Sequence, residues 1–250
     1  MNYAVYPCKI MRVTQNYNGK TSHKPHTTGA PKDYPIDEGC SDAGKEYIYC
    51  PCDEMKIKRI YGVGTKGTNT IWLESTEKVD FADGTKDFLT LMIIHPDDID
   101  IKGLKVGDIF KRKEKITREG TDGATGNHLH ISAGKGKMKG NGWIRNSKGK
   151  WVLTTSNAAA KPEDVFYIDT DFTKVISKGS INFRKLPDKY TSGYYKVDTA
   201  VLNVRSGAGT YYKKKGVLVK GRKVKITKVK GNWGQYAENR WVCLDYCRFM

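Results

Sequence analysis

Long apolar segments are missing from this 250-residue sequence. No window of about 18 apolar residues occurs, so the sequence predicts no membrane-spanning helix. The N-terminal segment MNYAVYPCKIM lacks the basic stretch followed by an apolar stretch that a signal peptide requires. We therefore expect synthesis in the cytoplasm without a leader, so that action outside the cell would need another route of release.

Acidic residues are scarce relative to basic ones. The sequence has 27 Asp and Glu against 44 Lys and Arg, which gives a formal net charge of +17. Such an excess predicts polyanionic partners, either nucleic acids or the anionic polymers of a cell wall. The charge alone does not choose between these two, but the sequence contains no zinc-finger, basic-region or RNP pattern.

Cysteine is also sparse, with six residues at positions 8, 40, 50, 52, 243 and 247. Six are too few to define a disulfide scaffold in a chain of this length. Cys50-Pro51-Cys52 lacks both the spacing of about two to four residues and the second pair that structural zinc sites use. The sequence therefore predicts structural or reduced thiols at all six positions.

Sustained helical periodicity is absent, and short β-rich runs take its place. Residues 47–64, 69–75 and 87–95 are rich in β-branched and aromatic residues and are separated by turn residues. ADGTKD at 82–87 contains Asp-Gly, a hairpin signal. NAAAKPEDVF at 157–166 is the best candidate for a short helix, with a proline in its first turn. The pattern predicts a mainly β protein.

Composition divides the sequence into two predicted domains. The stretch 168–192 is polar and without clear alternation, so we expect a linker there. The residues before this linker, 1–167, are the first predicted domain. Short alternating runs return at 193–250, and about five strands in so short a segment are typical of a small β-barrel.

Histidine occurs only five times, always in the first domain, in three stretches flanked by glycine or proline: His23 with His26, His95, and His128 with His130. Side chains at positions i and i+2 of a strand project from the same face, so GNHLHISAG presents two imidazoles together, with the leucine directed into the core. Two neutral imidazoles are half of a tetrahedral zinc site. An isolated His-x-His pair would indicate only hydrogen-bonded surface residues, but the grouping of all five predicts a site.

These stretches resemble the lysostaphin/LytM-type zinc endopeptidases. EGTDGATGNHLHISAG at 119–134 is similar to the closing motif of that family, in which a glycine-threonine loop leads into His-Leu-His on a strand. LTLMIIHPDD at 89–98 resembles the strand that ends in an additional active-site histidine. VGDIFKRKEKITREG at 106–120 resembles the stretch before the closing motif. The resemblance covers about residues 10–166, in the family's order.

The resemblance implies an antiparallel β-sheet metallopeptidase domain that binds Zn2+ through His23, Asp37 and His130. His128 and His95 would flank the catalytic water, and the sequence does not decide which of them is the general base. Zinc held by two imidazoles and one carboxylate keeps a fourth position for water and lowers the pKa of that water toward about 7. An unligated histidine nearby can then take up a proton and pass it to the leaving amine.

The spacing of the first two ligands departs from the family pattern. The family's first motif commonly places His and Asp four residues apart, whereas Asp37 follows His23 by 14 residues and His26 by 11. Ligands must be close in space rather than in sequence, so an inserted loop does not exclude the site. We assign His23 as the ligand and keep His26 as its rival.

Residues 202–246 resemble bacterial SH3-like cell-wall-binding domains. The matching segments are LNVRSGAGT, GVLVKGRKVKI, NWGQY and WVCLDY. Residues 191–250 carry 13 Lys and Arg against 3 Asp and Glu, hence a net charge of +10. Tyr211 and Tyr212 are the expected contacts for peptide or sugar. Their basic neighbours would add attraction to anionic wall polymers that salt weakens.

We expect a zinc-dependent endopeptidase that hydrolyses the peptide cross-links of bacterial peptidoglycan, a phage-type endolysin that acts on the wall after release. The alternative is a catalytically inactive wall-binding adaptor or regulator with a peptidase fold. Inactive relatives usually lose a ligand, whereas each required residue type is present here. A nucleic-acid-binding protein explains the charge but neither the histidine grouping nor the resemblances, so no nucleic acid is expected as a partner.

Overall fold

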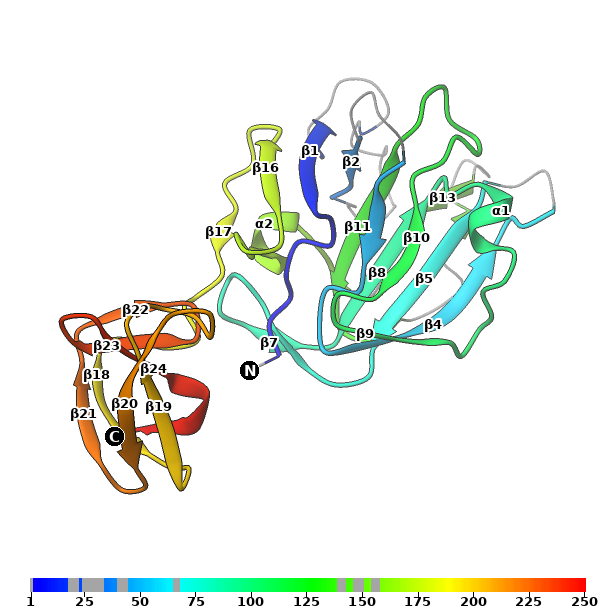
Figure 1. The fold of residues 1–250 in the computed structure, drawn as a ribbon. Coiled ribbons are helices and arrows are strands. Elements are labelled where there is room, and N and C mark those ends of the chain that lie inside the picture. The colour runs from blue at the N-terminus through cyan, green and yellow to red at the C-terminus, as the bar shows by residue number, and fades with distance from the viewer. Residues whose placement is uncertain are drawn as a thin grey trace. The chain divides into compact units, whose positions relative to one another are not determined.

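The computed structural model of the chain describes residues 2–17, 23, 34–39, 45–64, 68–138, 143–145, 151–153 and 158–250. The chain divides into two compact units, Met1–Leu186 and Pro187–Met250. Strands dominate both units, which confirms the predicted mainly β fold (Figure 1). Among the described residues, the helices are too short to cross a membrane.

A nine-stranded sheet forms the centre of the first unit (Figure 1). In spatial order it contains β16 (Lys174–Ser177), β1 (Ile10–Gln15), β2 (Ile36–Glu38), β11 (Leu129–Lys135), β8 (Leu89–Ile94), β5 (Thr70–Ser75), β4 (Glu54–Tyr61) and β9 (Ile109–Lys111), and β14 (Ala158–Ala160) pairs with β11 beside this path. All its pairs are antiparallel except β1 with β16.

The central strands of this sheet are buried on both faces. Every residue of β5 and β8 is buried. Leu73 and Leu91 face the main core, while Trp72 and Met92 form a second, smaller cluster on the other face. Burial on both faces explains why these strands read as continuous apolar runs rather than as alternating patterns.

Short strand pairs and helices surround the sheet. The pairs are β3 (Tyr47–Tyr49) with β10 (Lys115–Arg118), β6 (Val79–Asp80) with β7 (Lys86–Asp87), β12 (Trp143–Arg145) with β13 (Trp151–Leu153), and β15 (Tyr167–Ile168) with β17 (Arg184–Lys185). The helices are α1 (Asp98–Ile101) and α2 (Pro162–Val165). Asp83 and Gly84 close the β6–β7 hairpin, with Gly84 at φ 88°, as the Asp-Gly signal predicts.

The short helix predicted within 157–166 is confirmed at Pro162–Val165, with the proline in its first turn as expected, and is wrong for the alanine run. Ala158–Ala160 instead form β14, which pairs with Ala133–Lys135 of β11. Local propensity favours a helix in an alanine run, but pairing with an available sheet strand overrides that weak preference.

The linker predicted at 168–192 also needs correction. Residues 174–177 form β16 in the sheet of the first unit, and Ile181 and Phe183 are buried in its core. The second unit begins at Pro187, within the expected linker. β16 is an edge strand whose adjacent Val175 and Ile176 are both exposed, so its sequence shows no apolar alternation although the segment is folded.

The second unit contains two sheets. One has the order β21 (Lys223–Ile226), β18 (Gly193–Val197), β25 (Cys247–Phe249); the other has β20 (Lys214–Val219), β19 (Val201–Arg205), β24 (Arg240–Cys243), β23 (Trp233–Ala237), β22 (Lys228–Lys230). A 3₁₀ turn at Leu244–Tyr246 precedes β25. In β19, Leu202 and Val204 point into the core and Val201 and Asn203 point outward. The alternation in the sequence therefore predicts this strand correctly.

Candidate metal centre

Strands β2, β11 and β8 bring polar side chains to one end of the central sheet. His130 of β11 lies directly opposite Asp37 of β2 on one side and Ile94 of β8 on the other. Directly opposed residues of antiparallel strands project to the same face, so Asp37 and His130 meet there. His95 follows Ile94, which places a second histidine beside His130.

Three ligand-type atoms converge at this point. His23 Nε2 lies 3.0 Å from Asp37 Oδ1 and 3.2 Å from His130 Nδ1, and His130 Nδ1 lies 3.1 Å from Asp37 Oδ1. His23 and Asp37 are buried, with 5% and 7% of their surface exposed. The structure therefore brings together the three side chains expected as ligands, across an interval of 107 residues. The rival ligand, His26, lies outside the described residues.

The donor set fits a zinc ion. Zinc bonds of about 2.0–2.1 Å in a tetrahedral arrangement place two ligand atoms about 3.3 Å apart, close to the three distances found here. His23 donates its Nδ1–H to the carbonyl oxygen of Asn16 at 2.9 Å, so a neutral His23 turns the Nε2 lone pair toward Asp37. A lone pair and a carboxylate oxygen facing each other at 3.0 Å repel unless a proton or a cation lies between them.

The end of β1 orients two of these side chains. Gln15 donates from Nε2 to Asp37 Oδ2 at 2.8 Å, which leaves Oδ1 directed at the centre. The main-chain carbonyl of Asn16, the next residue, accepts the hydrogen bond from His23 Nδ1–H, and Asn16 Nδ2 donates to the carbonyl of Gly179 at 2.6 Å. Outer hydrogen bonds of this kind fix the orientation of metal ligands. Nothing in the sequence pattern predicts these roles for Gln15 and Asn16, and Gln15 pairs with Asp37 only because the register shifts between Val13 and Gln15.

Neighbouring carboxyls on β2 have opposite electrostatic environments. Burial alone would raise the pKa of Asp37, but when the facing nitrogens of His130 and His23 carry protons in place of a cation, their hydrogen bonds and charge hold that pKa well below its usual range. Burial raises the pKa of Glu38 to about 8, although Tyr6 Oη–H and the Arg12 N–H both donate to this carboxyl. Asp37 is therefore the carboxylate available to a cation, while Glu38 belongs to the core.

The two remaining histidines flank the same centre. His128 Nε2 lies 3.8 Å from Asp37 Oδ1, and the His128 ring centroid is 4.6 Å from that of His95. His128 donates Nδ1–H to the carbonyl of Gly126 at 2.9 Å, and His95 donates Nδ1–H to that of Asp122 at 2.7 Å. Burial lowers the pKa of His95 to about 4. With Nδ1 protonated, each neutral ring keeps Nε2 as a proton acceptor.

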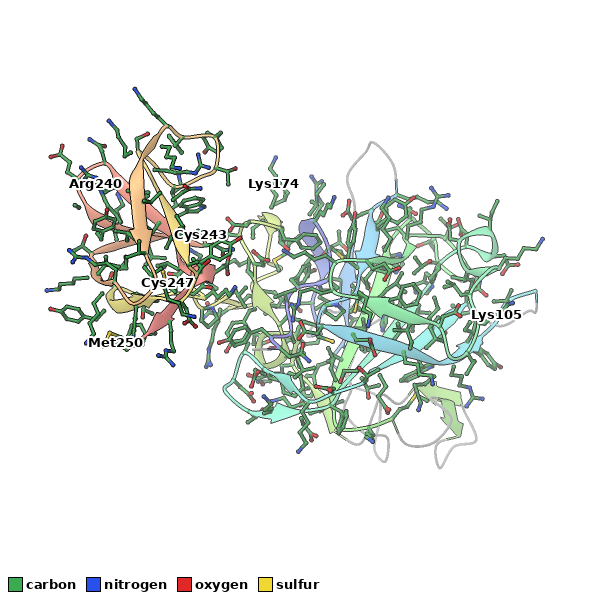
Figure 2. The ribbon with its side chains drawn as sticks, turned by 60° about the horizontal axis from the view of Figure 1, so that its bottom comes forward. Lys105, Lys174, Arg240, Cys243, Cys247 and Met250 are labelled. Atoms are coloured by element: carbon green, nitrogen blue, oxygen red, sulfur yellow. The ribbon has the colours of Figure 1, made fainter. Side chains whose placement is uncertain are left out.

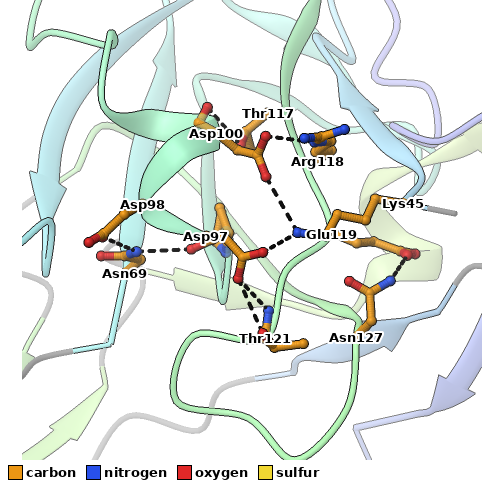
Figure 3. Close-up of polar contacts among 11 residues, drawn as sticks. Lys45, Asn69, Asp97, Asp98, Asp100, Thr117, Arg118, Glu119, Thr121 and Asn127 are labelled. Carbon is orange, nitrogen blue, oxygen red and sulfur yellow. Dashed lines mark hydrogen bonds and ion pairs between the residues drawn. The ribbon is translucent and has the colours of Figure 1, made fainter.

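A polar network of Asn69, Asp97 and Thr121, drawn in Figure 3, holds the backbone on both sides of Pro96, the residue after His95. The backbone of His95 has φ 79°, a value that residues other than glycine rarely adopt. Its N–H donates to Asn69 O at 3.0 Å, and Asn69 Nδ2 donates to Pro96 O at 3.0 Å. Asp97 Oδ1 accepts the N–H of Thr121 at 2.8 Å, as Figure 3 shows. Strained backbone held by its surroundings is frequent at functional sites.

Gly120 brings the loop before β11 against the backbone of this segment. A Cβ at position 120 would overlap the carbonyl oxygen of His95 and the amide nitrogen of Asp97. Gly120 and His128 also form an isolated antiparallel bridge. Glycine at this position therefore lets the segments that carry His95 and His128 approach each other.

The second unit presents an exposed aromatic pair. The rings of Tyr211 and Tyr212 lie 4.5 Å apart at an angle of 33°, with 81% and 37% of the residues exposed. The ring of Tyr212 lies against Gly207 and that of Tyr211 against Gly209, where added Cβ atoms would lie 2.6 Å from ring carbons. The loop thus presents two exposed aromatic rings at the surface, the type of side chain that sugars and peptides contact.

The cysteines described by the structure are free thiols. Cys8, Cys50 and Cys52 are buried, whereas Cys243 and Cys247 are partly exposed. Cys50 donates from Sγ toward the carbonyl of Phe110 at 3.3 Å. The prediction of structural or reduced thiols is confirmed at these five positions, and Cys40 lies outside the described residues.

Sequence comparisons identify relatives of both parts of the chain. Residues 200–237 match the bacterial SH3 domain family, which confirms the resemblance stated for residues 202–246. A relative is Morphogenesis protein 1 of Bacillus phage B103, with 30% identity over 147 residues. That match covers 57% of this chain and 34% of the relative, so the chain spans about a third of that protein's length.

Solved structures also show similarity to the chain. Helicobacter pylori Csd3 is 20% identical with a TM-score of 0.33, and the match covers 53% of this chain and 30% of that chain. The antimicrobial peptidase lysostaphin from Staphylococcus simulans is 16% identical with a TM-score of 0.37, covering 93% of this chain and 87% of that chain. A solution NMR structure of lysostaphin gives 16% identity, a TM-score of 0.33, and coverages of 97% and 88%.

Proposed function

We propose that the protein is a zinc-dependent endopeptidase that hydrolyses the peptide cross-links of bacterial peptidoglycan and binds the cell wall through its second unit. The observation that carries this proposal is the convergence of His23, Asp37 and His130 within hydrogen-bonding distance of one another, with His95 and His128 beside them. Two imidazoles and a carboxylate are a ligand set that catalytic zinc sites use, and further histidines nearby can transfer protons.

His23, Asp37 and His130 would hold the metal, with Gln15 and Asn16 keeping two of these side chains in place. When bound, zinc polarises the scissile carbonyl and lowers the pKa of a water molecule.

His95 and His128 carry the proton chemistry of the proposed reaction. Because each donates Nδ1–H to a main-chain carbonyl, its Nε2 is available to take a proton from water and return it to the leaving amine. The structure offers both rings for this role. Substituting His95 and His128 one at a time identifies the residue that transfers the proton. Loss of that residue should abolish turnover and leave metal binding intact.

The second unit supplies attachment to the substrate in this proposal. Its match to bacterial SH3 domains, the exposed Tyr211–Tyr212 pair and its basic composition support binding to the wall. We also propose a phage-type lytic role, for which the morphogenesis protein of a Bacillus phage supplies a phage relative and no evidence of lysis. We further propose that the protein acts on the wall after release from the cytoplasm.

The test uses the purified full chain and suspensions of bacterial cell walls. We expect about one zinc per chain and a loss of turbidity that a chelator abolishes and added zinc restores. His130→Ala should lose both zinc and lysis, because it removes a ligand. His128→Ala should keep zinc and lose lysis. Wall binding without lysis by the zinc-loaded protein would contradict the proposal and favour the inactive adaptor.

A further inference from the structure

Three cations form a row across the three-stranded sheet of the second unit. Lys196 of β18 lies directly opposite Lys223 of β21 and directly opposite Arg248 of β25. Directly opposed residues in antiparallel strands project to the same face. Strands in a sheet are about 4.8 Å apart, so the three side chains leave the backbone along a line about 10 Å long.

This row lies on the outer face of the sheet. Tyr195, Val197 and Val224, which alternate with the row along β18 and β21, point into the core. Lys223 and Arg248 are exposed, and Lys196 is half-buried, with its stem running past Gly221.

The neighbouring row extends the same surface. Tyr194 lies opposite Lys225, both side chains are exposed, and Lys225 Nζ is 5.8 Å from the centre of the Tyr194 ring. We call Lys196, Lys223, Lys225, Arg248 and Tyr194 the cationic face.

Among the described residues, none of the four cations of the cationic face forms an ion pair, although Asp198 follows Lys196 by two residues. The structure describes all of residues 187–250, and the ion pair found there joins Lys189 to Asp245. None of the four cations takes part in it. Like charges directly opposite each other destabilise a sheet, so the row does not contribute to folding stability. The fold keeps several positive charges side by side where a bound anion would neutralise them.

We propose that the cationic face binds the phosphodiester backbone of an anionic cell-wall polymer. A line of cations on an open sheet face fits a chain of repeating negative charges better than a single small anion, which needs an enclosing pocket. Lysine and arginine both bind phosphate, and the planar guanidinium of Arg248 can contact two phosphate oxygens at once. The proposal rests on the wall binding proposed above and assigns it a surface separate from Tyr211 and Tyr212.

The test compares two triple variants of the full chain with equal loss of charge. The face variant is Lys196→Gln with Lys223→Gln and Arg248→Gln. The matched control is Lys228→Gln with Lys230→Gln and Arg240→Gln, three exposed cations on β22 and β24 of the other sheet of this unit. Met250 marks the position of the cationic face, because its N–H donates to the main-chain carbonyl of Tyr194. Figure 2 shows Arg240 well away from Met250, so the control residue Arg240 lies apart from that face. Both variants must retain the melting temperature and zinc content of the parent chain.

Affinity is measured by co-sedimentation with intact walls and with walls stripped of phosphodiester polymers by hydrofluoric acid, over a series of salt concentrations. On intact walls the face variant should bind about tenfold more weakly, and the slope of log affinity against log salt should fall by about 2. The control should change affinity less than about threefold. On stripped walls the parent and the face variant should bind equally.

Three results would overturn the assignment. Equal losses in both variants would mean that net charge alone attracts the wall. If the face variant lost as much affinity on stripped walls as on intact walls, the cationic face would contact glycan or peptide instead of the phosphodiester polymer. A loss of duplex DNA binding with unchanged wall binding would identify a nucleic acid as the partner. If the triple variant fails to fold, Arg248→Gln and Arg240→Gln are compared in the same way.

The outcomes also separate this proposal from the proposed enzymatic function. Face-dependent binding to intact walls without peptidoglycan cleavage would support the surface and contradict the endopeptidase. Zinc-dependent cleavage with no preference for polymer-bearing walls would contradict the surface alone.

Discussion

Gln15 offers the sharpest test of how the site is built. Its Nε2 donates to Oδ2 of Asp37 at 2.8 Å, next to the oxygen that faces the candidate metal position. Asp37 is buried, so no water readily replaces this donor in a Gln15→Leu variant. Losing one outer hydrogen bond to a metal ligand typically weakens metal binding by about 10- to 100-fold, which corresponds to about 1.4–2.7 kcal/mol. We expect a loss in this range.

The matched control is Thr14→Val. Thr14 Oγ1 donates to the main-chain carbonyl of Asp37 at 3.1 Å, so this variant removes a neighbouring hydrogen bond without touching the carboxylate. Zinc affinity is measured by competition with a coloured chelator, and unfolding of the metal-free proteins is followed in parallel. Thr14→Val should change stability more than zinc affinity. A zinc affinity within about twofold of the parent for Gln15→Leu would refute the positioning role, since it lies far below the expected range.

Three further predictions concern other parts of the structure. Gly120→Ala should destabilise the protein by about 1–3 kcal/mol and reduce turnover, because the added methyl group overlaps the backbone at His95; unchanged melting temperature and activity would contradict this. Burial raises the pKa of Glu38 to about 8, so this group favours folding below its unfolded pKa and its contribution is lost as pH rises toward 8. Denaturant unfolding of the metal-free protein should therefore show a decline of up to about 1.4 kcal/mol per pH unit between about pH 5 and 8, and an equally steep decline in Glu38→Gln would argue against it. Tyr211→Ala combined with Tyr212→Ala should weaken wall co-sedimentation at unchanged zinc content, whereas unaltered binding would remove the pair from the binding surface.

The candidate ligands could be predicted because their chemistry is local to short motifs. His130 and His128 lie in a glycine-flanked motif whose strand geometry follows from alternation. Asp37 and His23 are separated by 14 residues, so their meeting depends on strand pairing rather than on spacing. The resemblance to a family predicts that His23 and Asp37 meet, whereas composition and periodicity do not.

The supporting residues could not be predicted from the sequence. Gln15 reaches Asp37 because of a register shift in the β1–β2 pair, and nothing in the alternation of β1 reports such a shift. The sequence predicts a linker where β16 lies, because this exposed edge strand has no apolar alternation. The positive φ of His95 depends on tertiary contacts with Asn69 and Gly120.

The most direct test of the account is a crystal structure of the zinc-loaded full chain with anomalous data collected at the zinc absorption edge. The account predicts one strong peak within about 2.0–2.2 Å of His23 Nε2, Asp37 Oδ1 and His130 Nδ1. A peak held by other residues, such as the thiols of Cys50 and Cys52, or no peak in crystals soaked with zinc, would contradict it.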